Sequence, residues 1–309
     1  MKKFDKIFRF LKSPGVILFI SLLSSCASLD PLFQKGNQAD NPSPPLYRLS
    51  TIADLRPHWQ VLYPGIEMYS FRTDTPALEV WALKIHLDNP AVSPVVGPEA
   101  EPGLPYGTVK SLRVSTFAQR YQCVAAINGS PFDPSSDREG ENRSIVGIGV
   151  EQGRWVSPAV AKYAALVFYP DKTAAVVSQG TLPLNPPIHN AIGGFFVVLS
   201  QGKVRGTTGI RNPRSAAGLG DGGKTLYLVA IDGRRKASVG ATSFETGQIL
   251  SLLGAEDGLI FDGGGSTALV LKQQDGSYRP LNVPIHGGKP FQERAVALSL
   301  GIRLTETGE

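Results

Sequence analysis

The chain has 309 residues, with 31 Lys and Arg against 26 Asp and Glu, and a formal net charge of +5. Its composition, 42% apolar and 18% charged, supports a sizeable core and excludes wholesale disorder. The 34 glycines and 24 prolines follow no three-residue period, which excludes collagen and predicts many tight turns, and two cysteines are too few for a disulfide scaffold.

The first 25 residues have the pattern of a secretory signal peptide. A basic head precedes a short apolar run at residues 16–23, which is too short for a stable transmembrane helix. The run ends in Leu23-Ser24-Ser25-Cys26, which resembles a bacterial lipobox; the alternative is an ordinary signal peptide with a chance cysteine. We expect lipidation of Cys26 and a membrane anchor through that lipid. Since Ala27 rather than aspartate follows, we expect a place in the bacterial cell envelope, at the outer membrane or its periplasmic face.

Removal of this segment changes the charge of the protein. The segment contains five basic residues and one acid, Asp5, so the mature chain has 26 basic and 25 acidic residues and a net charge of +1. A nearly neutral mature chain gives no reason to expect nucleic acid as a partner. The remaining cysteine, Cys123, precedes the apolar run 124–127 and is predicted to be a small buried residue.

The rest of the chain divides into a tether and one domain. Residues 26–50 contain Asn41-Pro42-Ser43-Pro44-Pro45 and little apolar periodicity, which predicts a flexible, lipid-anchored tether. Residues 51–309 show no break in composition and no repeat, which predicts a single domain. Short apolar runs bounded by turn residues predict strands at 78–87, 124–127, 145–150, 164–169, 174–178, 195–199, 226–231, 259–261, 268–272 and 295–302.

Two segments predict helices. One is expected over 108–122, from its apolar spacing, and a better-signalled one over 242–253. The second has the spacing of a capping box from Thr242 to Glu245, and Gly254 marks its end. The predicted fold class is α+β (mixed α/β), a strand-rich mixed sheet with a few flanking helices in a single domain.

The segment from Gly218 to Thr225 matches the phosphate-binding loop pattern of nucleotide hydrolases, but its context differs. That pattern needs a helix starting at its lysine, so that backbone amides and the helix dipole face the phosphates. Lys224 is instead followed by the apolar run 225–231, which is typical of a strand. We therefore predict a hairpin with its turn at Asp221-Gly222-Gly223, and no nucleotide ligand.

Three predicted strands end in polar, glycine-containing turns. These turns are Asn128-Gly129, Asp232-Gly233-Arg234 and Asp262-Gly263-Gly264-Gly265-Ser266-Thr267. The first two are most simply turn residues. Three consecutive glycines have an entropic cost, which a loop tolerates when its backbone must approach a ligand or adopt a positive φ. The adjacent Ser-Thr adds hydroxyls and amides that suit an anion.

These motifs together resemble the phosphodiester glycosidase family. Asp262-Gly263-Gly264-Gly265-Ser266-Thr267 is similar to the family hallmark. Further matches occur in family order: Asn128-Gly129 followed by Phe132, Ala191-Ile192-Gly193-Gly194, Pro213-Arg214-Ser215-Ala216-Ala217-Gly218, Asp232-Gly233-Arg234 and Glu293-Arg294-Ala295-Val296. The resemblance covers about residues 75–303. Departures at Ser130-Pro131, Asp133 and Ala297-Leu298 lie beside these motifs, so the exact sugar is not carried over.

The resemblance implies hydrolysis of the glycosidic bond of a sugar-1-phosphodiester, such as an N-acetylhexosamine-1-phosphodiester, on a glycan or cell-envelope polymer. A phosphate monoester is a good leaving group, so the reaction depends on stabilising the oxocarbenium-like carbon and the departing phosphate. The candidate catalytic carboxylates are Asp262 and Asp232. The candidate substrate- and phosphate-binding residues are Asn128, Gly129, Arg214, Arg234, Gly263, Gly264, Gly265, Ser266, Thr267 and Arg294, the arginines because a guanidinium is a two-pronged donor.

Other readings of the motifs stay open at this point. The four histidines show no short zinc spacing, and no residue is assigned as a metal ligand, but a calcium or magnesium ion held by Asp and carbonyl oxygens would leave no distinctive pattern. The alternatives to a glycosidase are a non-catalytic, glycan-binding envelope lipoprotein and a metal-dependent phosphodiesterase that cuts the P–O bond.

Overall fold

The computed structural model describes residues 46–182 and 187–305. By its contacts the chain separates into residues 1–41 and residues 42–309, and the fold below is that of the second unit. The predicted signal peptide, the lipidation of Cys26 and most of the predicted tether lie outside the described residues. Within the described residues, the structure contains no helix of the length and apolar character needed to cross a membrane.

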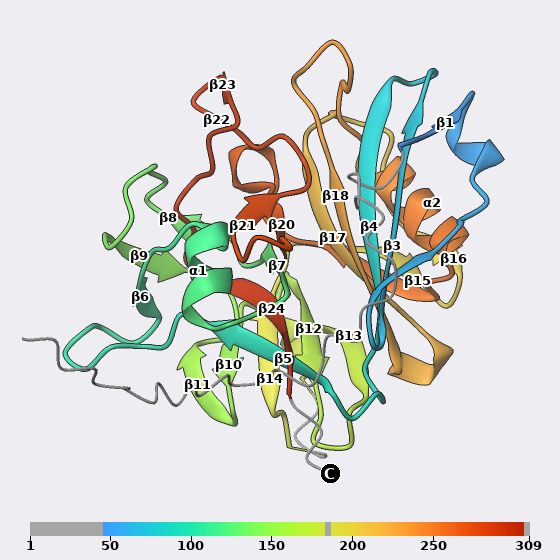
Figure 1. The fold of residues 1–309 in the computed structure, drawn as a ribbon. Coiled ribbons are helices and arrows are strands. Elements are labelled where there is room, and N and C mark those ends of the chain that lie inside the picture. Colours follow the sequence, from blue (N-terminus) through green and yellow to red (C-terminus); the bar gives the residue numbers. More distant parts are fainter. Residues whose placement is uncertain (1–45, 183–186, 306–309) are drawn as a thin grey trace, which may run out of the picture. The chain divides into compact units, whose positions relative to one another are not determined.

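The largest sheet has nine strands and carries three of the six predicted motifs, those at residues 213–218, 232–234 and 262–267 (Figure 1). Its order is β1-β3-β4-β18-β17-β19-β15-β16, with β2 also pairing with β3. All of its pairs are antiparallel except β1 with β3. The strands are β1 (Tyr47–Leu49), β2 (Gln60–Tyr63), β3 (Ile66–Thr73), β4 (Leu78–His86), β15 (Val197–Ser200), β16 (Lys203–Val204), β17 (Arg214–Gly220), β18 (Thr225–Ile231) and β19 (Asp257–Ile260).

Two five-stranded antiparallel sheets have the orders β21-β20-β7-β24-β5 and β11-β10-β14-β12-β13. The strands of the first are β5 (Val92–Gly97), β7 (Ala125–Asn128), β20 (Leu269–Lys272), β21 (Tyr278–Pro280) and β24 (Ser299–Leu304). Those of the second are β10 (Gly149–Glu151), β11 (Arg154–Ser157), β12 (Ala164–Phe168), β13 (Ala174–Ser178) and β14 (Asn190–Gly193). Smaller pairings join β6 (Thr108–Lys110), β8 (Phe132–Asp133) and β9 (Asn142–Ile145), and join β22 (Ile285–His286) to β23 (Lys289–Pro290).

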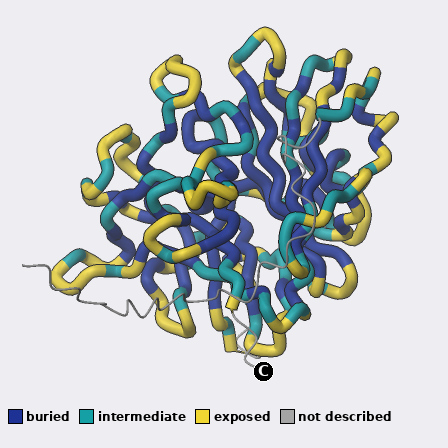
Figure 2. The backbone as a smooth tube through the Cα atoms, in the orientation of Figure 1, coloured by how far each residue is buried: buried dark blue, intermediate teal, exposed yellow. Residues whose placement is uncertain are grey.

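The three large sheets share one hydrophobic core. Leu83 of the nine-stranded sheet, Ile127 and Leu300 of the second sheet, and Leu166 and Ile192 of the third all belong to one cluster of fully buried side chains. Figure 2 shows that the sheet strands are largely buried, whereas exposed residues lie mainly in the connecting loops. Burial of these apolar faces holds the strand ends that carry the predicted motifs in fixed positions.

The predicted second helix is confirmed as α2 (Ser243–Leu253). The Thr242 hydroxyl accepts a hydrogen bond from the Glu245 amide at 3.1 Å, and the Glu245 carboxylate accepts one from the Thr242 amide at 2.9 Å. Gly254 ends the helix with φ of 112°, in the left-handed region that favours glycine. The remaining helical turns are the short 3-10 segments η1 (Ile52–Asp54), η2 (Gln179–Thr181), η3 (Asp221–Gly223) and η4 (Gly264–Ser266).

The predicted first helix is only half right. Residues 114–120 form α1 (Val114–Arg120), but residues 108–110 form β6, which pairs with β9, and Leu112 makes an isolated bridge to Val296. The β-branched Thr108 and Val109 fit a pleated strand better than a helix. The apolar spacing over 108–122 was therefore set by two different elements.

The fold-class prediction is confirmed only in its strand-rich part. The described residues contain two α-helices and several mostly antiparallel sheets, so the domain is dominated by β-structure rather than being a balanced α+β fold. The predicted strand 145–150 is interrupted near Gly147, whose φ is 113°. The last residues of the predicted flexible tether are also ordered differently from the prediction, because Tyr47–Leu49 form the strand β1.

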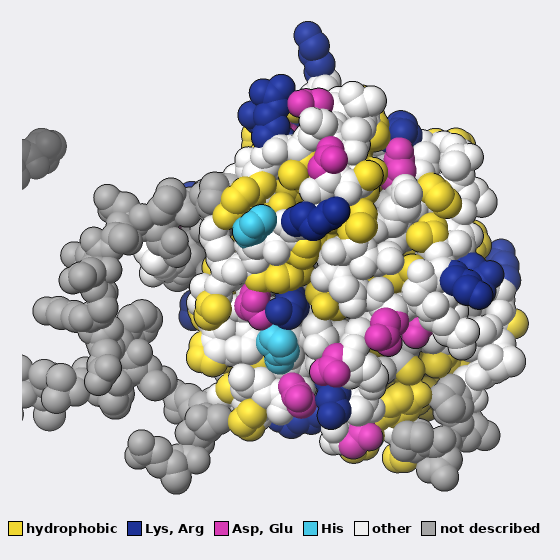
Figure 3. Space-filling view, turned by 90° about the vertical axis from the view of Figure 1, so that its right-hand side faces the viewer, with side chains coloured by type: hydrophobic (Ala, Val, Ile, Leu, Met, Phe, Trp, Pro, Cys, Tyr) yellow, Lys and Arg dark blue, Asp and Glu magenta, His cyan; other side chains and the backbone are white. Residues whose placement is uncertain are grey.

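The predicted hairpin at residues 214–231 is confirmed, since β17 pairs with β18 in register from Arg214↔Ile231 to Gly220↔Thr225. The Asp221–Gly223 turn joins two strands, with no helix after Lys224. On the face shown in Figure 3, basic and acidic side chains are interspersed with apolar ones.

Candidate active site

Three strand ends of the nine-stranded sheet meet at one edge. Because β17 is antiparallel to both β18 and β19, its first residue, Arg214, lies at the edge where β18 and β19 end. Asp232 follows β18 directly, and Asp262 follows β19 after one residue. The topology thus brings three motifs that are far apart in the sequence to the same edge.

The end of β7 in the second sheet joins them (Figure 1). The Asp262 amide donates to the Gly129 carbonyl at 2.9 Å, and the Asn128 side-chain amide donates to the Asp262 carbonyl at 2.6 Å. The Asn128 side-chain oxygen accepts hydrogen bonds from the Ser215 hydroxyl at 2.6 Å and the Ala268 amide at 3.2 Å. Asn128 is only 1% exposed, so it fixes the Asp262 backbone rather than presenting its amide at the surface.

The three glycines form a turn that other backbone and arginine atoms approach closely. The Gly264 amide donates to the Pro213 carbonyl at 2.9 Å, and Gly264 has φ of 61°, which favours glycine. A Cβ added to Gly263 would lie 2.7 Å from the Pro213 oxygen. Added Cβ atoms on Gly264 and Gly265 would lie 2.8 Å from Nη2 of Arg234 and 2.5 Å from Nη2 of Arg294. The glycines are therefore required for two guanidinium groups to lie against the turn.

A hydrogen-bonded chain connects the carboxylate of Asp262 to one of these arginines. The Ser266 hydroxyl donates to Oδ2 of Asp262 at 2.6 Å, and Nη1 of Arg294 donates to the Ser266 oxygen at 3.2 Å. Burial raises the pKa of Asp262, while the Ser266 hydroxyl and the Arg294 charge act in the opposite direction. Burial lowers the pKa of Arg294, and nearby Arg234 adds to that effect.

Arg234 and Arg294 are available to an anionic ligand. Among the described residues, neither arginine forms an ion pair with a carboxylate. Arg234 is exposed and makes a long contact of 3.5 Å with the side-chain oxygen of Asn212. Two guanidinium groups at one turn are a set of donors that suits phosphate oxygens.

Asp232 has a different environment from Asp262. Its side chain is fully buried and accepts hydrogen bonds from Nδ2 of Asn282 at 3.2 Å, from the Val283 amide at 2.9 Å and from Nη2 of Arg235 at 2.5 Å. Arg235 also pairs with Glu79. Burial raises the pKa of Asp232 to about 6, against the opposing effect of Arg235. These contacts anchor residues 282–283 to the sheet edge, which is a structural role that the Asp-Gly-Arg pattern did not reveal.

Arg214 also binds backbone rather than facing the turn. Its Nε donates to the Ala241 carbonyl at 3.0 Å and its Nη2 to the Ile210 carbonyl at 2.9 Å. Burial lowers its pKa. Arg214 thus ties together two loops that surround the glycine turn.

Two buried hydroxyls and one histidine complete the surroundings of the turn. Oγ of Ser130 and Oγ1 of Thr267 are buried and have no hydrogen-bond partner among the described residues. His286, at the end of β22, contacts the turn, and its Nδ1 accepts a hydrogen bond from Nε of Arg294 at 3.0 Å. His286 was not among the predicted site residues, because no motif in the sequence includes it.

Neither a metal site nor a reactive thiol is evident in the described part of the chain. No group of three or more His, Cys, Asp or Glu side chains there is arranged to hold a metal ion. Cys123 is buried as predicted, and burial raises the pKa of its thiol to about 12. A thiol with so high a pKa is almost entirely protonated near neutrality and is a poor nucleophile.

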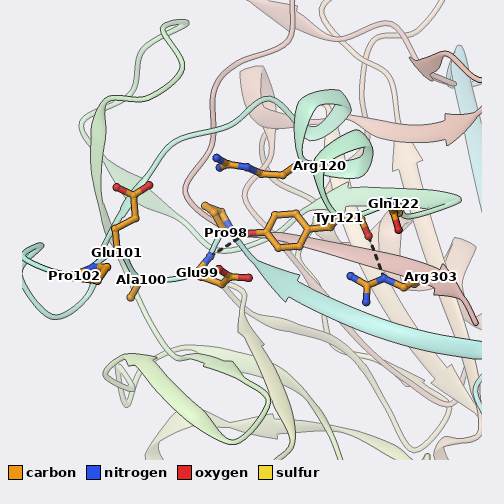
Figure 4. A pocket seen from close by; sticks show the side chains of 9 residues that line it. All are labelled: Pro98, Glu99, Ala100, Glu101, Pro102, Arg120, Tyr121, Gln122 and Arg303. Atoms are coloured by element: carbon orange, nitrogen blue, oxygen red, sulfur yellow. Dashed lines mark hydrogen bonds between the residues drawn. The ribbon is translucent and has the colours of Figure 1, made fainter.

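A cavity of about 450 Å³ lies away from this turn (Figure 4). It is lined by residues 98–102, Arg120, Tyr121, Gln122 and Arg303, and Nε of Arg303 donates to the Tyr121 carbonyl at 3.1 Å. Asn128 pairs with Ser299 in β24, and Arg303 is four residues further along that strand, or roughly 13 Å. The cavity is therefore separate from the turn that gathers the predicted motifs.

The strand-rich fold gathers one carboxylate and two arginines at a single glycine turn, a combination of groups that suits an anionic ligand. A family model described as phosphodiester glycosidase matches residues 121–303, more than half of the chain. The chain therefore belongs to the phosphodiester glycosidase family, and the resemblance of its motifs is confirmed.

Individual relatives are distant. The chain is 26% identical over 177 residues to the SPbeta prophage-derived uncharacterized protein YomE of Bacillus subtilis (strain 168), which covers 52% of this chain but only 26% of that relative. The catalytic domain of zebrafish N-acetylglucosamine-1-phosphodiester alpha-N-acetylglucosaminidase, auto-inhibited by its pro-peptide, superposes with a TM-score of 0.61 and 19% identity, over 83% of this chain and 91% of that one. A hypothetical protein from Synechocystis gives a TM-score of 0.58 and 16% identity, over 82% and 65%. These structures share the fold.

Proposed function

We propose that this protein hydrolyses the glycosidic bond of a sugar-1-phosphodiester, such as an N-acetylhexosamine-1-phosphodiester, in the bacterial cell envelope. The observation that carries the proposal is the chain from Asp262 through Ser266 to Arg294 on the glycine turn. The proximity of a carboxylate to an arginine supports a site that reacts with a phosphate-bearing substrate. Membership in the family and the name of the zebrafish relative support the same chemistry.

The roles follow from the contacts of each residue. Asp262 is the reactive carboxylate, because it borders the glycine turn and is less buried than Asp232. Arg234 and Arg294 bind the phosphate and stabilise the charge that develops as it departs. Asn128, Arg214 and Asp232 hold the turn and its flanking loops in position.

The bond that breaks distinguishes this proposal from its rivals. The purified protein is incubated with a panel of sugar-phosphodiesters in heavy-oxygen water, and the products are analysed by mass spectrometry. A glycosidase gives free sugar carrying the heavy oxygen, together with an unlabelled phosphomonoester. Sugar-1-phosphate with label in a phosphate identifies a phosphodiesterase instead. Tight binding without any product identifies a glycan-binding protein. Either of the last two outcomes overturns the proposal.

The acid limb of the pH profile provides a second test. If ionised Asp262 is required, activity is lost as the pH falls through its pKa. The Ser266 hydroxyl stabilises the ionised form, so Ser266→Ala raises the pKa of Asp262 and moves the acid limb of kcat/KM to higher pH. Ser215→Ala removes a similarly buried hydroxyl that contacts Asn128 rather than the carboxylate. We expect no shift in that control; equal shifts in both variants would contradict the assignment.

We also propose that the protein is held in the envelope by a lipid on Cys26. The lipobox-like Leu23-Ser24-Ser25-Cys26 after a basic, apolar leader supports this. Metabolic labelling with a radioactive fatty acid should label the wild-type protein, and Cys26→Ser should abolish both the label and membrane fractionation. Equal labelling of the variant would contradict the proposal.

A further inference from the structure

His286 lies against the glycine turn, although no motif includes it. β22, which ends at His286, contacts the 3-10 turn Gly264–Ser266. Nδ1 of His286 lies 3.1 Å from the position of a Cβ on Gly265, so a side chain there would crowd the ring. The residue is half-buried, so part of its surface remains accessible.

The hydrogen bond from Arg294 fixes which ring nitrogen of His286 carries the proton. A guanidinium only donates, so Nδ1 must accept the bond from Nε of Arg294 at 3.0 Å. The proton of the neutral ring is then on Nε2. In the described part of the chain, the bond from Arg294 to Nδ1 is the one hydrogen bond of the His286 ring, and Nε2 has none. The histidine therefore presents one N–H donor that has no partner among residues 46–182 and 187–305.

The surroundings keep this donor uncharged near neutral pH. Burial and the charge of Arg294 lower the pKa of His286, and Asp137 opposes them. Gly265, which also lies against the ring, has no charge. Protonation of Nδ1 would also replace an acceptor with a donor facing Arg294. The ring is thus suited to donate a hydrogen bond, and poorly suited to supply a full proton.

We propose that His286 is a further catalytic residue, whose Nε2–H binds an oxygen of the departing phosphate. This rests on the proposed function. Phosphate is the expected ligand because Arg294 and Arg234 place two positive charges beside the same turn, and guanidinium groups bind phosphate oxygens well.

Hydrolysis of the glycosidic bond needs no proton from His286. The bond between the anomeric carbon and the phosphate oxygen breaks, and its electron pair stays on the phosphate, which leaves as the phosphomonoester. Water supplies the hydroxyl to the anomeric carbon and its remaining proton passes to the carboxylate of Asp262. His286 stabilises the charge on the phosphate oxygen through its N–H throughout.

Two amide substitutions separate the functions of the two ring nitrogens. In His286→Asn the side-chain oxygen takes the place of Nδ1 and still accepts from Arg294, but the outward donor is lost. In His286→Gln the amide nitrogen reaches the place of Nε2. We expect kcat/KM of the Asn variant to fall by about a hundredfold, as for loss of one transition-state donor, and the Gln variant to retain most of the activity. Wild-type activity in the Asn variant, or an equal loss in both, overturns the proposal.

A binding measurement keeps this inference separate from the proposed function. Titration calorimetry of the full chain with inorganic phosphate and with a sugar-free phosphomonoester should show weaker binding in the Asn variant and little change in the Gln variant. Nitrogen NMR of the wild-type ring should show the proton on Nε2; a proton on Nδ1 overturns the inference. If this binding pattern holds but no substrate releases sugar, the proposed function fails and the phosphate contact of His286 stands.

Discussion

Replacing Asp262 with asparagine is expected to lower kcat by about a thousandfold, within the range for loss of a group that transfers protons or attacks in the transition state. The carboxylate lies on the glycine turn, where the Ser266 hydroxyl donates to one of its oxygens and Arg294 donates to the Ser266 oxygen. Asparagine has nearly the same shape but cannot take a proton from water or attack the anomeric carbon. The measurement is the rate of sugar release at saturating substrate.

The matched control for this variant is Asp257→Asn. Asp257 lies at the other end of the same strand, where its carboxylate accepts a hydrogen bond from the Gln201 amide at 3.0 Å. The same substitution there should leave kcat within a small factor of the wild-type value. Retention of a tenth or more of the wild-type kcat by Asp262→Asn, with an unchanged melting temperature, would contradict the assignment of Asp262.

The position of Asp262 was predictable because strand ends and turns are local features of the sequence. A run of apolar residues at 259–261 followed by Asp-Gly-Gly-Gly predicts a buried strand that stops at a turn, and the structure places β19 and the 3-10 turn there. The hairpin around Asp221-Gly222-Gly223 was predictable in the same way, since Lys224 is followed by a strand pattern rather than a helix start.

The different roles proposed for Asp262 and Asp232 were not predictable, because each role depends on hydrogen-bond partners that are distant in the sequence. Asp232 accepts hydrogen bonds from Asn282 and Val283, about fifty residues further along the chain. In the sequence, Asp232-Gly233 and Asp262-Gly263 both read as an Asp-Gly turn after a strand, so the pattern does not distinguish them. His286 was missed for the same reason, since its significance arises from a bond to Arg294 and from contact with Gly265.

The error at residues 108–122 has a different physical origin. The apolar residues of this segment fit a helical spacing, but Thr108 and Val109 pair with β9, and the helix begins only at Val114. A strand partner some thirty residues away outweighs a weak local preference. The capping box at Thr242 succeeded because both of its hydrogen bonds are local.

Replacing Asp232 with alanine is expected to lower the free energy of unfolding by about 3 to 5 kcal/mol, as for removal of one partner from a buried ion pair. Asn282 and Val283 each lose an acceptor in a fully buried site, and Arg235 keeps only Glu79. The measurement is the shift of the denaturant midpoint at an unchanged slope. Glu79→Gln is the control, because Glu79 contacts the same guanidinium from a partly exposed position, and we expect a smaller loss there.

The asparagine variant at this position decides whether Asp232 takes part in the chemistry. If Asp232 were the second catalytic carboxylate, Asp232→Asn would abolish turnover at little cost in stability, as expected for Asp262→Asn. Since Asp232 instead holds residues 282–283, three residues before His286, we expect the opposite order. The free energy of unfolding of Asp232→Asn should fall clearly. The kcat of its folded fraction should drop by no more than about tenfold, which is the size of a positioning effect rather than of the loss of a catalytic group. A thousandfold loss of kcat in a stably folded Asp232→Asn protein would return Asp232 to the role that the sequence predicted.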